Sequence, residues 1–316
     1  MNIEKIFDYA RENNISDIHL LEGEKIYFRK DGEIIEYDGT DTVSKEELLE
    51  ICNGKIEEDF AYTDSKSQRY RVNSFLTRGK LALVIRIINK EPIKLKGKFI
   101  NKLIDEKILS LKDGLVLVTG ITGSGKSTTL ANIIEKFNEN KNLKILTIED
   151  PIEYIFENKK SLIIQRELGK DVESFEKALK SSLRQDPDVI ILGEIRDEES
   201  LYSALKLAET GHLVFSTLHT MNTVESVNRL ISMVRSEKKD FIREQLTSVL
   251  RFILSQELYR GKKTVPIFEI LNNTKAVANL ILNNKLNQIP TLIESGIENF
   301  MITKEKYLKN LETESD

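Results

Sequence analysis

Short apolar runs alternate with helical patterns over the latter part of the chain. Runs of strand length occur at 114–119, 143–148, 188–193 and 212–219. After the first run, apolar residues recur at the spacing of one helix face. Strands that alternate with helices predict an α/β domain with a doubly wound, largely parallel sheet of RecA-like type. From about residue 224 onward the pattern is mostly helical, with one strand-like run at Val265–Ile270.

The beginning of the chain shows a different pattern, in which short alternating runs surround two helical segments. One amphipathic helix is predicted at the start and a second at 45–52, where Ser44 and Glu47 have the spacing of a capping box. The predicted strands are 17–21, 25–29, 33–37, 70–75 and 81–88. The predicted division is a small α/β domain over 1–88, a polar linker over 89–99 and a second domain over 100–316.

Composition limits the class of protein. The 316 residues suffice for two domains, and the net charge of −4, with both signs interspersed, argues against a dedicated nucleic-acid surface. Cys52 is the single cysteine, which excludes an intrachain disulfide and fits a reducing cytoplasm. The sequence has neither an apolar run of membrane-spanning length nor a signal-peptide core, so we expect any membrane association to go through a partner.

The first chemical signal is the loop that follows the run at 114–119. Residues 120–127, GITGSGKS, match G-x-x-x-x-G-K-[ST] between a strand and a helix, a context in which backbone N–H groups bind polyphosphate. We expect Lys126 to reach the β- and γ-phosphates and Ser127 to ligate Mg²⁺, which makes ATP and Mg²⁺ the predicted cofactors. The predicted nucleotide contacts are Thr122, Gly123, Ser124, Gly125, Lys126, Ser127 and Thr128. A glycine-rich turn without a ligand is the alternative.

Carboxylates follow two of the other strands. Glu194 comes after the run at 188–193, where an acid in P-loop enzymes polarises the attacking water or supports Mg²⁺. It is the candidate catalytic base; the alternative is a turn cap or a pair with Arg196. Another group leaves the run at 143–148, at the edge where open α/β sheets bind ligands. These are Glu149, Asp150 and Glu153, expected to hold Mg²⁺ partly through water or to orient a water, unless they form only an acidic turn.

Two histidines and two arginines complete the candidate set. His212 and His219 bracket a strand and lie on opposite faces by their odd spacing, so we do not expect them to share a metal. His219 is expected to hydrogen-bond a γ-phosphate, and His212 to contact a neighbour. Arg71 and Arg86 each interrupt an apolar alternating strand of the first domain. Each is either a solvent-facing residue or a charge aimed at an outside ligand, and composition favours the first.

Together these segments resemble the type II and type IV secretion-system ATPases, the family that includes the pilus motors. In the N-terminal part of the chain, residues 10–32 resemble the family's PAS-like domain. The other matching segments are a Walker A loop at 120–129, an Asp box at 147–154, a Walker B region at 182–197 and a His box at 210–220. The resemblance implies a PAS-like domain, a RecA-like ATPase domain and a homohexameric ring.

The resemblance also implies roles for individual residues. Arg71 and Arg86 match the positions of arginine fingers that act in trans on a neighbouring subunit. Glu194 matches the catalytic acid and His219 a residue near the γ-phosphate. The three acids Glu149, Asp150 and Glu153 match residues around metal and water.

Within the family the chain is most similar to the retraction type of pilus motor. It lacks the four-cysteine zinc site and the long N-terminal region usual in assembly ATPases. The resemblance thus implies retraction of type IV pili, with an inner-membrane platform protein as partner at the cytoplasmic face of the plasma membrane. Pilus assembly, competence or type II secretion is the alternative. Ala278 and Leu282 stand where arginines are expected, and Glu257 replaces an expected basic residue.

Two functions of other classes remain for comparison. A RecA-like nucleic-acid translocase would need a basic lumen or stacking aromatics, whereas this chain has no Trp and a negative charge. A regulatory module that binds nucleotide without turnover is disfavoured by the presence of Glu194 and His219.

Overall fold

The structure is a computed structural model that describes residues 3–39, 42–66, 68–88, 92–261 and 264–315. The chain forms two compact units. The first comprises Met1–Glu91 with Pro151–Ile155, and the second comprises Pro92–Asp150 with Phe156–Asp316. The predicted linker 89–99 lies partly outside the described residues, and its end belongs to helix α3 (Lys98–Glu106). No helix in the described part of the chain is both long and apolar enough to span a membrane.

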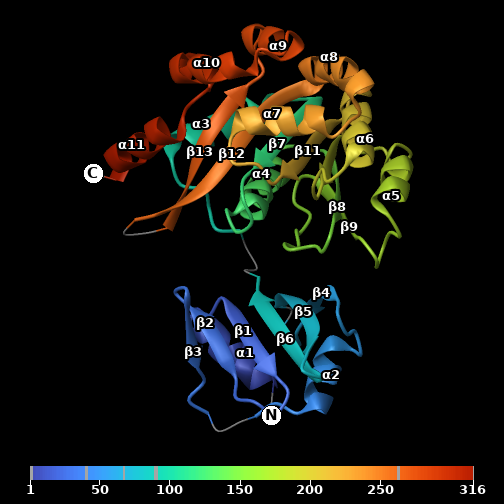
Figure 1. The fold of residues 1–316 in the computed structure, drawn as a ribbon, viewed down its shortest axis with the longest axis vertical. Coiled ribbons are helices and arrows are strands. Elements are labelled where there is room, and N and C mark those ends of the chain that lie inside the picture. The colour runs from blue at the N-terminus through green and yellow to red at the C-terminus, as the bar shows by residue number, and fades with distance from the viewer. Residues whose placement is uncertain (1–2, 40–41, 67, 89–91, 262–263, 316) are drawn as a thin grey trace. The chain divides into compact units, whose positions relative to one another are not determined.

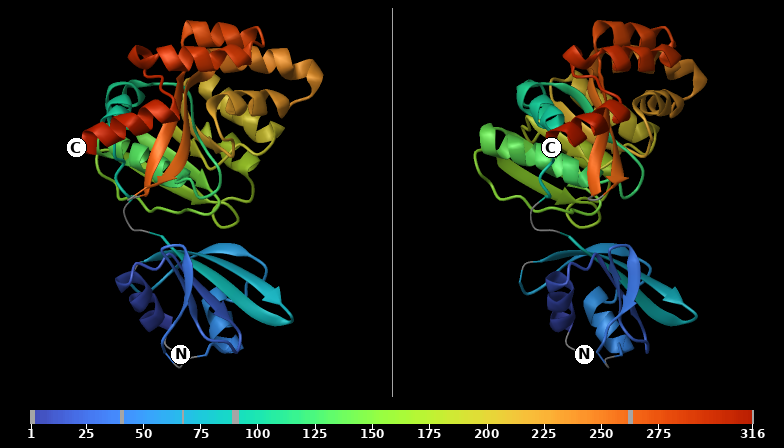
Figure 2. Two further views of the ribbon diagram at one scale, coloured as in Figure 1. Left: turned by 60° about the vertical axis from the view of Figure 1, so that its left-hand side comes forward. Right: turned by 90° about the vertical axis from the view of Figure 1, so that its left-hand side faces the viewer.

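The first unit is an antiparallel sheet with two helices on one face (Figure 1; Figure 2). The strands, in the order β3-β2-β1-β6-β5-β4, are β1 (Asp17–Leu21), β2 (Tyr27–Lys30), β3 (Glu33–Glu36), β4 (Asp59–Thr63), β5 (Arg69–Thr77) and β6 (Lys80–Ile87). Of these, β4 is not among the predicted strands. Helix α1 (Ile3–Glu12) and helix α2 (Lys45–Cys52), which begins with the predicted capping box, pack on this sheet.

Alternation along the strands divides the first sheet into two faces. Ile18 and Ile85 are fully buried in the core that α1 and α2 share with the sheet. Because successive side chains of a strand point to opposite faces, Asp17, Arg71 and Arg86 lie on the face that these helices do not cover.

The second unit is built on a seven-stranded sheet in the order β13-β12-β7-β11-β10-β8-β9. The strands are β7 (Gly114–Thr119), β8 (Lys144–Glu149), β9 (Leu162–Glu167), β10 (Val189–Leu192), β11 (Leu213–Leu218), β12 (Leu250–Arg260) and β13 (Thr264–Asn272). All neighbours are parallel except β12 and β13. The carboxyl ends of the parallel strands therefore meet at one edge of the sheet.

Helices cover both faces of this second sheet (Figure 1). They are α3, α4 (Lys126–Asn140), α5 (Phe175–Ser182), α6 (Glu198–Glu209), α7 (Thr223–Ser232), α8 (Lys239–Val249), α9 (Lys275–Leu282), α10 (Ile289–Ser295) and α11 (Lys304–Ser315). Val116 and Val118 of β7 are buried with α3, α4 and α11, whereas Leu115 and Leu117 are buried with α5 to α10. The sheet is therefore doubly wound, and the predicted α/β class is confirmed.

The region after residue 224 departs from its predicted pattern. Its helices are present, but it also contains β12, an 11-residue strand that pairs in parallel with the P-loop strand β7. The predicted strand-like run 265–270 belongs to β13, which pairs with β12 along its length. This region thus completes the sheet beside the P-loop.

Candidate ATP site

The P-loop leaves the fully buried strand β7 and enters α4 directly. Gly125 precedes the helix with φ at 86°, in the left-handed region that favours glycine. A Cβ on Gly120 would lie 2.4 Å from the carbonyl oxygen of Gln256 and 2.5 Å from Ser124 Oγ. The tight path of the loop therefore depends on glycine at both positions.

Two polar groups of the loop are suited to a phosphate ligand. Lys126 is 9% exposed, and its Nζ donates to the carbonyl oxygens of Gly120 (2.7 Å) and Ile121 (3.1 Å). The hydroxyl of Ser124 is buried and has no hydrogen-bond partner among the described residues. Since buried polar groups in proteins are nearly always paired, this hydroxyl within a phosphate-binding loop fits a site made for a bound nucleotide.

Gln256 lies in the middle of β12, just after the last residue that pairs with β7, and it supports the P-loop. It was not among the predicted site residues. Its side-chain Nε2 donates to the carbonyl oxygen of Ser124, and its Oε1 accepts from the hydroxyl of Thr129, both at 2.6 Å. Gln256 is 3% exposed and Thr129 is fully buried. Both ends of the amide are therefore used to join the loop to the first turn of α4.

Glu194 and His219 meet at the carboxyl ends of β10 and β11. His219 Nε2 lies 2.9 Å from Glu194 Oε2, and His219 Nδ1 lies 3.4 Å from the Thr122 hydroxyl. Because an ionised carboxylate can only accept, Nε2 carries the proton, which leaves Nδ1 to accept from Thr122. A hydrogen-bonded path therefore runs from the P-loop through His219 to Glu194.

The protonation of His219 follows from its surroundings. Partial burial, followed by the nearby cations of Lys126 and Arg196, lowers the pKa of His219 below its ordinary value. The imidazole is therefore neutral at pH 7, which agrees with one ring nitrogen donating and the other accepting.

Arg196 links Glu194 to the acidic group after β8. Its Nε donates to Glu194 Oε1, and its Nη1 lies 3.6 Å from Asp150 Oδ2. The pairing of Glu194 with Arg196 was an alternative to a catalytic role, and the structure contains it together with the His219 contact. Glu149 accepts from the Thr147 hydroxyl (2.6 Å) and from Gln165 Nε2 (3.3 Å). Gln165 and Gln256 are site residues that the sequence motifs do not include, whereas Thr147 lies in the Asp box but was not among the predicted site residues.

In the first unit, Arg71 and Arg86 are direct neighbours across β5 and β6. Each has an acidic partner on an adjacent strand: Arg71 Nε lies 3.0 Å from Asp59 Oδ2, and Arg86 Nε lies 2.8 Å from Asp17 Oδ1. Asp17 is 4% exposed, whereas the Arg86 side chain is 60% exposed. Glu153, which belongs to this unit, lies 3.8 Å from Arg71. Metal binding by Glu153 stays a prediction.

His212 lies at the other end of β11 from His219. Its Nδ1 is 3.1 Å from the Thr210 hydroxyl and 3.2 Å from the Leu207 carbonyl oxygen. Its contact with a neighbouring subunit stays a prediction. In the ranges that the structure describes, no group of three or more His, Cys, Asp or Glu side chains is arranged to hold a metal ion.

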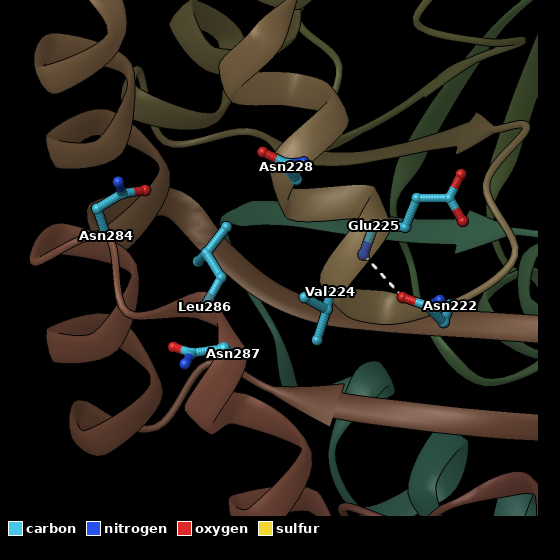
Figure 3. Close-up of a pocket in the computed structure, with 7 residues that line it drawn as sticks. All are labelled: Asn222, Val224, Glu225, Asn228, Asn284, Leu286 and Asn287. Atoms are coloured by element: carbon cyan, nitrogen blue, oxygen red, sulfur yellow. Dashed lines mark hydrogen bonds between the residues drawn. The ribbon is translucent and has the colours of Figure 1, made fainter.

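A separate open hollow of about 470 Å³ lies between α7 and the turn after α9 (Figure 3). Its lining is rich in amides and consists of Asn222, Val224, Glu225, Asn228, Asn284, Leu286 and Asn287. Asn222 caps α7 by accepting from the Glu225 backbone N–H at 2.8 Å. None of the predicted site residues lines this hollow.

Comparison with known proteins settles the family. Residues 1–278 match the family described as type II/IV secretion system protein. The chain belongs to this family. It is 36% identical to the type IV pilus retraction ATPase PilT of Pseudomonas aeruginosa, over 98% of this chain and 94% of that protein. It is 40% identical, over 96% of each chain, to the uncharacterized protein YggR of Escherichia coli K12.

A solved relative agrees with this membership. The crystal structure of the pilus retraction motor PilT with bound ADP superposes with a TM-score of 0.83 at 35% identity. The match covers 98% of this chain and 97% of that one. The predicted resemblance to the secretion and pilus motor ATPases is therefore confirmed. As a secretion-family ATPase, the chain has a nucleotide-binding fold.

Proposed function

We propose that the chain hydrolyses ATP to drive the retraction of type IV pili. The observation that carries this proposal is the hydrogen-bonded path from Thr122 in the P-loop through His219 to Glu194. It supports hydrolysis because it joins the phosphate-binding loop to a carboxylate suited to accept a proton from water. The pilus role is supported by the relatives of this secretion-family chain, two of which are named as retraction proteins.

The proposed chemistry assigns a step to each group. The P-loop N–H groups, the α4 N-terminus and Lys126 bind the phosphates, and Glu194 accepts the proton of the attacking water. Its other contacts, to His219 and Arg196, fix the plane of the carboxylate while lone pairs remain for the water. Mg²⁺ would be held by Ser127 and, partly through water, by Asp150, since it prefers oxygen ligands, and it would neutralise phosphate charge.

The proposed working form is a homohexamer. Arg71 and Arg86 are neighbours on an exposed sheet face, which suits a pair of guanidinium groups presented to the nucleotide of an adjacent subunit. We therefore expect a mixture of Arg71→Ala and Lys126→Ala subunits to recover part of the activity that each lacks alone. If the mixed subunits recover no ATPase activity in a steady-state phosphate-release assay, action of the arginines in trans is contradicted.

Hydrolysis is tested with Glu194→Gln, because this variant keeps the shape of the side chain and removes its basicity. We expect turnover to fall by about a hundredfold or more while ATP still binds. Glu198→Gln is the matched control, since Glu198 is an acid on the next helix whose partner, Lys238, lies outside the site. Equal turnover in Glu194→Gln and wild type would refute the assignment, and Lys126→Ala is expected to abolish nucleotide binding.

The direction of the motor is tested in cells. We propose a location at the cytoplasmic face of the inner membrane, on a platform protein of the pilus. A deletion strain is expected to keep its pili and to lose their shortening. Pili that still shorten would contradict retraction, and loss of the pili themselves would favour the assembly alternative.

A further inference from the structure

Three successive residues in the middle of β12, Ser255 to Glu257, contact both sides of the proposed ATP site. Gln256 holds the P-loop, as described above. Ser255 Oγ donates to the carbonyl oxygen of Met221 at 3.0 Å. Glu257 Oε2 lies 3.0 Å from Lys304 Nζ, and the same ammonium donates to the Met221 carbonyl oxygen at 2.9 Å. One backbone carbonyl therefore receives two donors, from β12 and from α11.

The position of Met221 gives this contact its significance. Met221 lies two residues after His219, in the connection from β11 to α7. Its N–H donates to Glu225 Oε2 at 2.8 Å, so its backbone is held on both sides. A shift of this connection would move His219 relative to Glu194 and Thr122, whose bonds to the imidazole depend on its position.

A lysine at position 304 does not stabilise helix α11. Lys304 is the first residue of the helix, where the partial positive charge of the helix dipole disfavours a cation. Its side chain is nevertheless only 19% exposed, whereas that of its partner Glu257 is 55% exposed. The contacts that offset the unfavourable position are the Met221 carbonyl and the Glu257 carboxylate.

We propose that Lys304 is a positioning residue for hydrolysis, which holds the connection after His219, and that Glu257 orients its ammonium. This gives Glu257, which stands where a basic residue is expected, a definite role, because a cation there would repel Lys304. The inference rests on the proposed function, because it assumes that His219 and Glu194 act in hydrolysis.

The test compares Lys304→Met, which removes the donor and keeps most of the stem, with Lys304→Arg, which restores a donor. We expect Lys304→Met to lower kcat about tenfold, with the Kd for a fluorescent ATP analogue changed less than twofold. Lys304→Arg is expected to recover at least half of the wild-type kcat. The control is Lys306→Met, because Lys306 lies on the same helix and also donates to a backbone carbonyl, that of Glu294, outside the site.

Glu257→Gln keeps the test decisive if Lys304→Met folds poorly, since Glu257 is exposed. We expect it to lower kcat about threefold without a change in Kd. Unchanged kcat in Glu257→Gln and Lys304→Met, or an equal loss in Lys306→Met, would overturn the inference. Glu194→Gln is measured alongside: if it retains full turnover, the proposed function fails, whereas its loss of turnover beside an active Lys304→Met overturns only the role of Lys304.

Discussion

Replacing Gln256 by Leu tests the support of the P-loop by β12. Leucine has nearly the volume of glutamine but cannot bond to either Ser124 or Thr129. The change removes two hydrogen bonds of 2.6 Å from a position that is 3% exposed. The Thr129 hydroxyl, in a fully buried residue, and the Ser124 carbonyl oxygen are then left without this partner.

The expected loss in the free energy of unfolding follows from the two buried groups that lose a hydrogen-bond partner. Each buried group that loses its partner costs about 1–3 kcal/mol, which gives about 2–6 kcal/mol in total. In a unit of this size, 1 kcal/mol corresponds to a shift in Tm of about 2–4 °C. We therefore expect the Tm of the second unit to fall by about 12 °C, and by no less than about 4 °C.

The assay is calorimetric unfolding with and without ATP. Gln245→Leu is the control, because its side chain donates a single bond, to the exposed Glu209. Thr129→Val removes one of the same two bonds from the other side. We expect the double variant Gln256→Leu with Thr129→Val to lose less stability than the sum of the single variants, since they share a bond. A Tm for Gln256→Leu within about 1 °C of wild type, or strict additivity of the two changes, would refute this reasoning.

Two further predictions concern His219 and Asp17. Because the pKa of His219 is lowered, the neutral ring and its contribution to stability are fully present above pH 6.5 and are lost as pH falls through the lowered pKa. We therefore expect the ATPase activity of the wild type to decline only below pH 6.5. This acid limb is expected to be absent in His219→Gln. An acid limb above pH 6.5 would contradict this. Asp17→Asn weakens the hold on Arg86, so we expect turnover to drop several-fold with unchanged nucleotide affinity; a drop in affinity instead would place the defect outside Arg86.

Local patterns predicted most of the fold. The capping box of α2 and the alternation of β5 and β6 follow from residues close together in the chain. The short connection between the predicted strands 70–75 and 81–88 also sets their register, because Thr77 pairs with Lys80 and the same pairing brings Arg71 opposite Arg86. The register of these two strands therefore follows from the sequence alone.

Strand β12 was not predicted from the sequence, for a physical reason. Its residues Phe252 to Leu254 are apolar on both sides of the sheet, because this part of the strand is buried between two helical layers. A short apolar run of that kind also suits a helix. The polar residues Ser255 to Glu257 then end the apolar run where the strand meets the candidate ATP site. β12 also directly follows α8, so no loop residue separates the two.

The candidate site likewise contains residues that the sequence predicts and residues that it does not. Lys126, Glu194 and His219 lie in local motifs whose chemistry can be recognised from sequence. Gln256 bonds to Ser124 across 132 residues, and Arg86 bonds to Asp17 across 69, so no local spacing relates them. Such contacts depend on the order of strands in a sheet, which the motifs do not contain.

The place of β12 beside β7 has a consequence for the synthesis of the protein. When the P-loop leaves the ribosome, the strands that will flank β7, namely β11 and β12, have not been made. At about 5–20 residues per second, Gln256 follows Ser124 by roughly 7 to 26 seconds. A nascent chain therefore carries the complete P-loop motif before Gln256, which holds this loop, has been made. We expect nucleotide binding to be acquired only after β12 has been translated.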